Sequence, residues 1–404
     1  MIQNRFSSHL LLILFYLFPL SSIQAELVNA PNKGAAWRKT MQELYKILAE
    51  MTTDTSSDQR FNAPENRKRI DKNTKKLVDR AHDLGNKVLS TDEDPTVKML
   101  SQLFHDETKR AELALKSGNR SYARGILNHV SSYCIACHTR NSSGINFSSL
   151  PLEPRVEPMT KNLSPLEKGR FYAATRQYDR ALDGFQEIIN DALAPIERPL
   201  EWEQAVRFGL SIAVRVKKDP AQARSLVERV IGSPHAPFFL KQDALKWKES
   251  IIQWKDELSK RALSEEGLRQ EAIQLTMQAK DLQKYSRDRA ADVLYLRATA
   301  VIHELLQKYP EGRYAGEALL MAGMCYEVIR PLILDELHEV YYEACIKKVP
   351  YTPTSEVCYR HFEQSVYEGF TGSGGTFLPE DLKKKLLNLE NLSHPKIFDK
   401  SQIH

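Results

Sequence analysis

Residues 121–138 read SYARGILNHVSSYCIACH, and the stretch ends in the motif C-x-x-C-H at positions 134–138. Apolar residues recur along this stretch at helical spacing, so we expect an amphipathic helix that carries the motif in its last turn. The motif is typical of covalent haem attachment, in which two thiols add to the haem vinyl groups and the histidine binds the iron. The sequence therefore predicts Cys134 and Cys137 as attachment residues and His138 as an iron ligand.

Paired cysteines at this spacing also occur as thiol redox pairs and as half of a zinc site. A redox pair normally follows a strand in a βαβ unit, and no such pattern surrounds the motif. A zinc site needs a second pair of ligands, and the sequence contains no other C-x-x-C and no H-x-x-x-H. Haem attachment fits best, and a redox dithiol remains the weaker alternative.

The N-terminus has the pattern of a secretory signal peptide. Arg5 precedes an almost wholly apolar run at 10–20, and small residues follow at 21–25, with Ala25 as the expected last residue removed. An uncleaved membrane anchor is the alternative. No later segment approaches about 18 consecutive apolar residues, so we expect no other membrane span. Bacteria attach covalent haem outside the cytoplasm, so the signal peptide and the motif both predict the periplasm.

Composition indicates an ordinary globular protein. The chain has 404 residues, enough for two or three domains, with 42% hydrophobic residues, 27% charged residues and a net charge of +5. This charge does not favour nucleic-acid binding. Three of the five cysteines remain after the motif, and an exported protein tends to form disulfides. Cys345 and Cys358 flank a segment that can reverse the chain, so we expect them to pair and Cys325 to stay buried with a free thiol.

Upstream of residue 140, the apolar pattern predicts an antiparallel bundle of four helices. In each predicted helix, apolar residues recur every three or four positions and form one stripe. Short polar loops separate them, so consecutive helices should pack as neighbours with a cofactor in the bundle core. The expected helices are 35–51, 66–89, 95–116 and 121–138.

A bundle of this length with C-x-x-C-H at the end of its last helix resembles the class II c-type cytochromes, the cytochrome c′ and c556 group. The resemblance covers the predicted haem domain, residues 26–140, and implies one covalently bound haem c with its iron. In that family an arginine and a methionine lie one turn apart in the first helix, and here Arg38 and Met41 are the matching types. The resemblance therefore implies Met41 as the second axial ligand. Weaker candidates are Met51, Met99, His82, His105 and His129.

Residues 141–164 are rich in proline and serine and lack a helical period, so we expect a linker that lets the haem domain move. From residue 165 to 340 the chain resembles degenerate tetratricopeptide repeats. The matching residues are Gly169, Tyr172, Tyr178, Ala181 and Phe185, followed by a second helix pair over 202–231 and a Tyr309-Pro310 ending. Residues 341–404 form the expected C-terminal helical extension and tail.

The predicted fold class is therefore all-α, with a haem-binding bundle followed by helical repeats. No catalytic motif of a hydrolase, metalloprotease or nucleotide-binding enzyme is present, so we do not expect an enzyme. The predicted function is electron transfer by an exported c-type cytochrome. The repeats, or the basic helix 67–80, would dock a redox partner protein or membrane complex. The alternative is a haem-based gas sensor or adaptor, and the sixth iron ligand separates the two.

Overall fold

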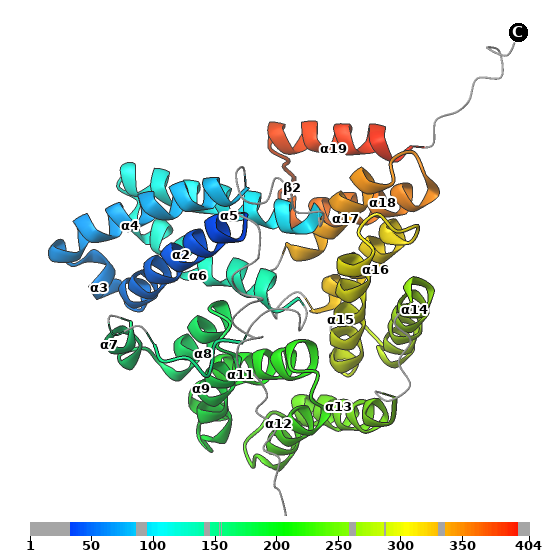
Figure 1. Ribbon diagram of the computed structural model, residues 1–404, viewed down its shortest axis with the longest axis horizontal. Helices are drawn as coiled ribbons and strands as arrows, with labels where there is room; N and C mark the ends of the chain where they lie inside the picture. Colours follow the sequence, from blue (N-terminus) through cyan, green and yellow to red (C-terminus); the bar gives the residue numbers. More distant parts are fainter. Residues whose placement is uncertain are drawn as a thin grey trace, which may run out of the picture.

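The structure is a computed structural model that describes residues 33–85, 95–140, 146–152, 154, 156–257, 264–286, 288–329 and 336–394. In these residues almost all regular structure is helical, apart from a short antiparallel hairpin of Thr371–Gly372 (β1) and Gly375–Thr376 (β2) (Figure 1). The predicted all-α class is confirmed. The expected signal peptide, 1–25, lies outside the described residues, and no described helix is long and apolar enough to cross a membrane.

The first region contains four long helices and one short one. They are α2 (Lys33–Thr55), α3 (Asp58–Asn62), α4 (Pro64–Asp83), α5 (Pro95–Lys116) and α6 (Arg120–His138). The sequence did not predict α3, which lies in the polar segment between the first two long helices. Its first turn is capped by the Ser57 side chain, which accepts from the backbone N–H of Arg60. α5 has the predicted bounds because Gly118, with φ of 81°, turns the chain immediately beyond it.

The long helices pack in sequence order, and α6 also packs against α2, which closes a four-helix bundle. Its core includes the predicted residues Ile70, Leu77 and Leu100. On α6 the predicted stripe was partly wrong, because Tyr122 is 50% exposed and the unpredicted Leu127 is buried. α2 and α6 are antiparallel, because the guanidinium of Arg124 near the start of α6 donates to the carbonyl oxygen of Thr55 at the end of α2. The C-terminus of α6 therefore lies at the same end of the bundle as the N-terminal half of α2.

The rest of the chain forms helices that pack mainly on their sequence neighbours. They are α7 (Glu157–Lys161), α8 (Pro165–Ala174), α9 (Tyr178–Asn190), α10 (Ala194–Glu197), α11 (Pro199–Ser211), the π-helical η2 (Ile212–Val216), α12 (Pro220–Gly232), α13 (Phe238–Glu257), α14 (Glu265–Leu282), α15 (Asp292–Lys308), α16 (Ala315–Ile329), α17 (Leu337–Lys348), α18 (Pro353–Phe370) and α19 (Glu380–Ser393).

Glycines let these helices approach closely. A Cβ atom at Gly169 would lie 2.3 Å from the ring of Phe185, so the aromatic ring of α9 occupies space that only a glycine on α8 leaves open. Gly323 on α16 stands in the same relation to the ring of Tyr342 on α17, also at 2.3 Å. The packing role expected for Gly169 and Phe185 is therefore present.

The helices after the bundle curve around until both ends of the array contact the bundle (Figure 1). α8 packs against α6 at one end, and α17 packs against α5 at the other. The segment expected to be a linker contains α7, which packs against α2. The segment therefore makes tertiary contacts, which proline spacing alone does not predict.

Cysteines outside the motif take the positions expected from the sequence. Cys345 on α17 and Cys358 on α18 form a disulfide. Cys325 on α16 is fully buried, with its sulfur 3.8 Å from the hydroxyl oxygen of Thr276. Burial raises the pKa of this thiol to about 12, so it behaves as a small apolar side chain.

Candidate functional site

The motif residues share one face of the last turn of α6. Positions 134, 137 and 138 are related by steps of three and four residues, which places their side chains on the same side of a helix. All three side chains are partly exposed, whereas the intervening Ile135 and Ala136 are buried in the core. The structure therefore presents the side chains of Cys134, Cys137 and His138 together on the least buried face of this turn.

The imidazole of His138 is held in one tautomer by a helix of the array. Its Nδ1 lies 2.7 Å from the carbonyl oxygen of Ala174, the last residue of α8. A carbonyl oxygen only accepts, so Nδ1 carries the hydrogen and Nε2 keeps its lone pair. Burial, with a smaller effect of the Arg176 charge, lowers the pKa of His138 to about 4 and keeps the ring neutral. A neutral imidazole held through Nδ1 is the usual state of a metal-binding histidine.

The backbone of His138 is held as well. The phenolic hydroxyl of Tyr178, at the start of α9, donates to the carbonyl oxygen of His138 at 2.7 Å. Sequence reasoning assigned Tyr178 to repeat packing and did not connect α8 or α9 with the motif. The Ala174 contact uses a backbone carbonyl, which leaves no signature in the sequence.

The thiol chemistry of the motif differs from that of a redox dithiol. Burial, together with the neighbouring Cys137 thiol, raises the pKa of Cys134 to about 12. The motif lies in the last turn of α6, where the helix dipole disfavours a thiolate. Reactive dithiols instead have lowered thiol pKa values, often at a helix N-terminus. The motif therefore lacks these two features of a reactive dithiol.

Met41 lies in the N-terminal half of α2, at the same end of the bundle as His138. The hydrogen bond from Arg124 to the carbonyl oxygen of Thr55 shows that the two helices run antiparallel, so both residues lie toward this end. The side chain of Met41 is partly buried and packs against the core.

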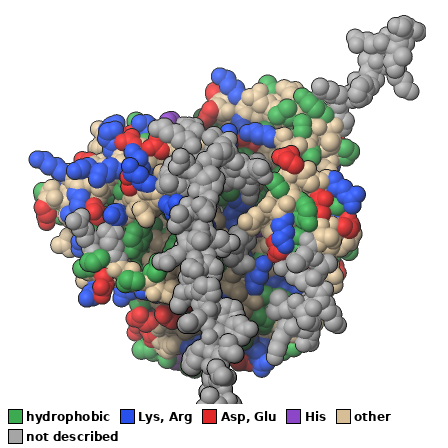
Figure 2. Space-filling view, viewed as in Figure 1, with side chains coloured by type: hydrophobic (Ala, Val, Ile, Leu, Met, Phe, Trp, Pro, Cys, Tyr) green, Lys and Arg blue, Asp and Glu red, His purple; other side chains and the backbone are tan. Residues whose placement is uncertain are grey.

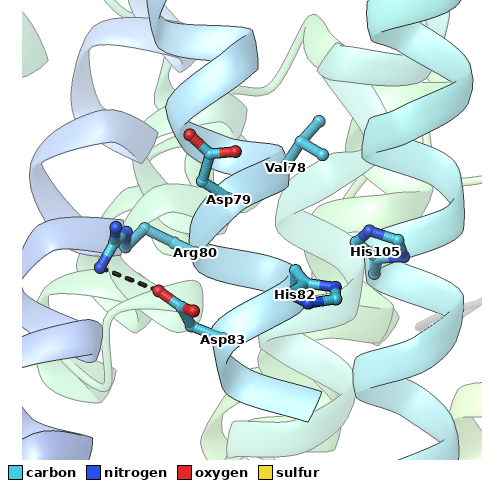
Figure 3. A pocket seen from close by; sticks show the side chains of 6 residues that line it. All are labelled: Val78, Asp79, Arg80, His82, Asp83 and His105. Carbon is cyan, nitrogen blue, oxygen red and sulfur yellow. Dashed lines mark ion pairs between the residues drawn. The ribbon is translucent and has the colours of Figure 1, made fainter. Parts of the chain in front are cut away.

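The histidines considered as alternative ligands lie on α4, α5 and α6. His82 on α4 and His105 on α5 have ring centroids 5.4 Å apart, and they line an open pocket of about 450 Å³ (Figure 3). Charged residues complete its lining, including the ion pair of Arg80 with Asp83 at 3.1 Å. His82 and His129 are exposed to solvent. The rings of His82 and His105 line this pocket between α4 and α5, and His129 lies on α6, nine residues before His138.

No protein-family model matches the chain, and neither a curated protein nor a solved structure is significantly similar to it. Within the part of the chain that the structure describes, no group of three or more His, Cys, Asp or Glu side chains is placed to hold a bare metal ion. The interpretation of the site therefore depends on the motif and on the chemistry of the residues around it.

Proposed function

We propose that this protein is an exported c-type cytochrome that carries one covalently attached haem and transfers electrons. The observation that carries the proposal is the hydrogen bond from Nδ1 of His138 to the carbonyl oxygen of Ala174, at 2.7 Å. It leaves Nε2 available to a metal, on the same helical face as the two thiols of C-x-x-C-H. The all-helical bundle that ends in the motif supports the resemblance to class II cytochromes.

In this proposal Cys134 and Cys137 tether the porphyrin and His138 binds the iron. A haem held there supplies a one-electron couple between ferric and ferrous iron. The carbonyl of Ala174 fixes the ring orientation of His138 and strengthens the imidazole as a donor. The thioether of Met41 is the proposed sixth ligand, and methionine in this position favours a higher reduction potential than a second histidine.

Two surfaces are proposed for docking a redox partner. Lys68, Lys72 and Lys76 form an exposed stripe along α4, and basic side chains gather over this part of the bundle (Figure 2). Such a stripe favours an acidic partner, because opposite charges increase encounter rates. The helical array, proposed to be of tetratricopeptide type, also exposes apolar residues suited to a protein partner, among them Phe238 and Phe239 on α13.

Export to the periplasm is part of the same proposal. It depends on the signal-peptide pattern of residues 1–25 and on the need to attach the haem outside the cytoplasm. The disulfide between Cys345 and Cys358 suits an oxidising compartment.

Absorption spectra of the ferric and ferrous protein, with and without carbon monoxide, test the proposal. An electron carrier with Met41 bound should be low-spin in both states and should resist carbon monoxide. A high-spin ferrous spectrum with rapid carbon monoxide binding would instead assign the protein to the gas-binding sensors, in which the sixth position is open.

A further inference from the structure

His82 and His105 place two imidazole rings side by side on neighbouring helices. His82 is in the last turn of α4 and His105 is in the middle of α5, and their ring centroids lie 5.4 Å apart (Figure 3). His82 is exposed and His105 is partly exposed, and both line the open pocket of about 450 Å³ between these helices. Two side chains of the type that most often binds transition metals are therefore accessible from solvent at one place.

The spacing of the two rings suits two ligands of one metal ion. Imidazole nitrogens bind Zn²⁺ at about 2.0–2.1 Å, and in a tetrahedral arrangement two such rings have their centroids about 5 Å apart. The observed 5.4 Å between the rings of His82 and His105 is close to this value. Because the ring of His82 is exposed, it can turn toward a shared ion without disturbing the core.

Asp106 orients the imidazole of His105 as a metal ligand. The Nδ1 atom of His105 lies 3.2 Å from a carboxylate oxygen of Asp106, which also accepts from the side-chain amide of Gln102 at 2.9 Å. An ionised carboxylate only accepts, so in the neutral ring Nδ1 carries the hydrogen and Nε2 has the lone pair. Metal-binding histidines usually have their other nitrogen held by such a hydrogen-bonded carboxylate. His82 also has two ring nitrogens, so a hydrogen bond at one of them leaves the other for a metal.

The charges around the pocket favour a cation. Asp79 and Asp83 line it together with Arg80, whose guanidinium pairs with Asp83 at 3.1 Å and with Glu43 at 3.3 Å. The lining therefore has more carboxylates than guanidinium groups. Within the described residues no three His, Cys, Asp or Glu side chains are placed around one ion, so water would complete the coordination of an ion held by the two rings. Such a site leaves more positions open to water than a structural zinc site with four protein ligands.

We infer that His82 and His105 form a binding site for one divalent transition-metal ion of the Zn²⁺ class, with water as the remaining ligands. Imidazole suits Zn²⁺, Cu²⁺ and Ni²⁺, whereas Ca²⁺ and Mg²⁺ require oxygen ligands. The ion joins the end of α4 to α5, and binding to the folded state stabilises the protein. The inference does not depend on the proposed function, because neither ring belongs to the C-x-x-C-H motif.

Calorimetric titration of the purified mature protein with Zn²⁺ tests this assignment. The wild-type protein should bind one Zn²⁺ at this site, and His82→Asn and His105→Asn should each weaken that binding by at least about tenfold, the loss that even an outer hydrogen-bond partner of a ligand causes. Because both rings hold the same ion, the double variant should bind hardly more weakly than either single variant. His235→Asn is the matched control, since His235 is exposed on the loop before α13 and should leave the affinity unchanged. Unchanged affinity in the single variants, independent losses that multiply in the double variant, or an equal loss in His235→Asn would overturn the assignment.

Melting temperatures and absorption spectra separate this site from the haem iron. Zn²⁺ should raise the melting temperature of the wild-type protein but not that of the double variant, and Mg²⁺ should raise neither. Both single variants should keep the wild-type haem spectrum. A changed haem spectrum in either variant would show that the ring is an iron ligand and would overturn the assignment. A wild-type protein without haem sinks the proposed function, whereas the Zn²⁺ titration still decides this inference.

Discussion

Tyr178 donates a hydrogen bond of 2.7 Å to the carbonyl oxygen of His138, and so joins the first helices of the array to the last residue of the motif. The bond lies beside the contact between His138 and Ala174, so α8 and α9 hold both the backbone and the ring of the predicted iron ligand. The array is therefore part of the site.

Tyr178→Phe should reduce the free energy of unfolding by about 1–2 kcal/mol, because it removes a donor from a carbonyl that is left without that partner. Urea denaturation of the holoprotein measures the change. Tyr285→Phe is the control, since that side chain is 65% exposed, and it should change stability little. Equal effects of the two substitutions would contradict the structural role of the Tyr178 bond.

Met41→Ala should convert the haem from low spin to high spin and open the iron to carbon monoxide, because the proposed thioether ligand is lost. The absorption spectrum reports both changes. Met324→Ala is the control, because Met324 is also partly buried but lies on α16, outside the bundle. If both variants keep the wild-type spectrum, Met41 is a core residue and the ligand must be sought elsewhere.

Gly169→Ala should destabilise the protein by about 1–3 kcal/mol, because the added methyl group would lie 2.3 Å from the Phe185 ring. Gly125→Ala on α6 is the matched control. Its added methyl group would have no atom of another described element within 4 Å, so the better helix propensity of alanine should stabilise the protein by up to about 1 kcal/mol. Thermal melts compare the two variants, and destabilisation of similar size in both would argue against the close packing of α8 on α9.

Replacing Cys345 and Cys358 together with serine should lower the free energy of unfolding by about 3 kcal/mol, because the disulfide closes a loop across 13 positions. Denaturation under non-reducing conditions measures the loss. Cys325→Ser tests the remaining thiol, and it should not change the disulfide found by peptide mapping. A cross-link to Cys325 in the wild-type protein would contradict the observed pairing.

Local features of the sequence predicted the bundle well. The motif could be recognised because covalent attachment requires a fixed spacing on one helical turn. Pro95 and Gly118 mark the ends of α5 because proline suits a first turn and glycine accepts the left-handed backbone that follows a helix. Apolar periodicity likewise located many core positions of α2, α4 and α5, but on α6 it favoured the exposed Tyr122 over the buried Leu127.

Contacts distant in sequence could not be predicted. The acceptor for His138 is the backbone carbonyl of Ala174, and every residue has a carbonyl. Arg215 lies in a segment with no distinctive pattern, and only the tertiary structure shows that it is buried without a carboxylate partner in the described residues. The contact of α17 with α5 joins helices more than 200 residues apart in the chain, and no local pattern encodes it.

The most direct test of the central claim is the mass and haem content of the mature protein, produced by a host that attaches haem, after denaturation and acid extraction. The account predicts one haem per chain that stays with the polypeptide and is located on the peptide containing Cys134 and Cys137. Cys134→Ala with Cys137→Ala should abolish this attachment. Haem that leaves the chain on extraction, or a mature protein with the mass of the polypeptide alone, would contradict the account.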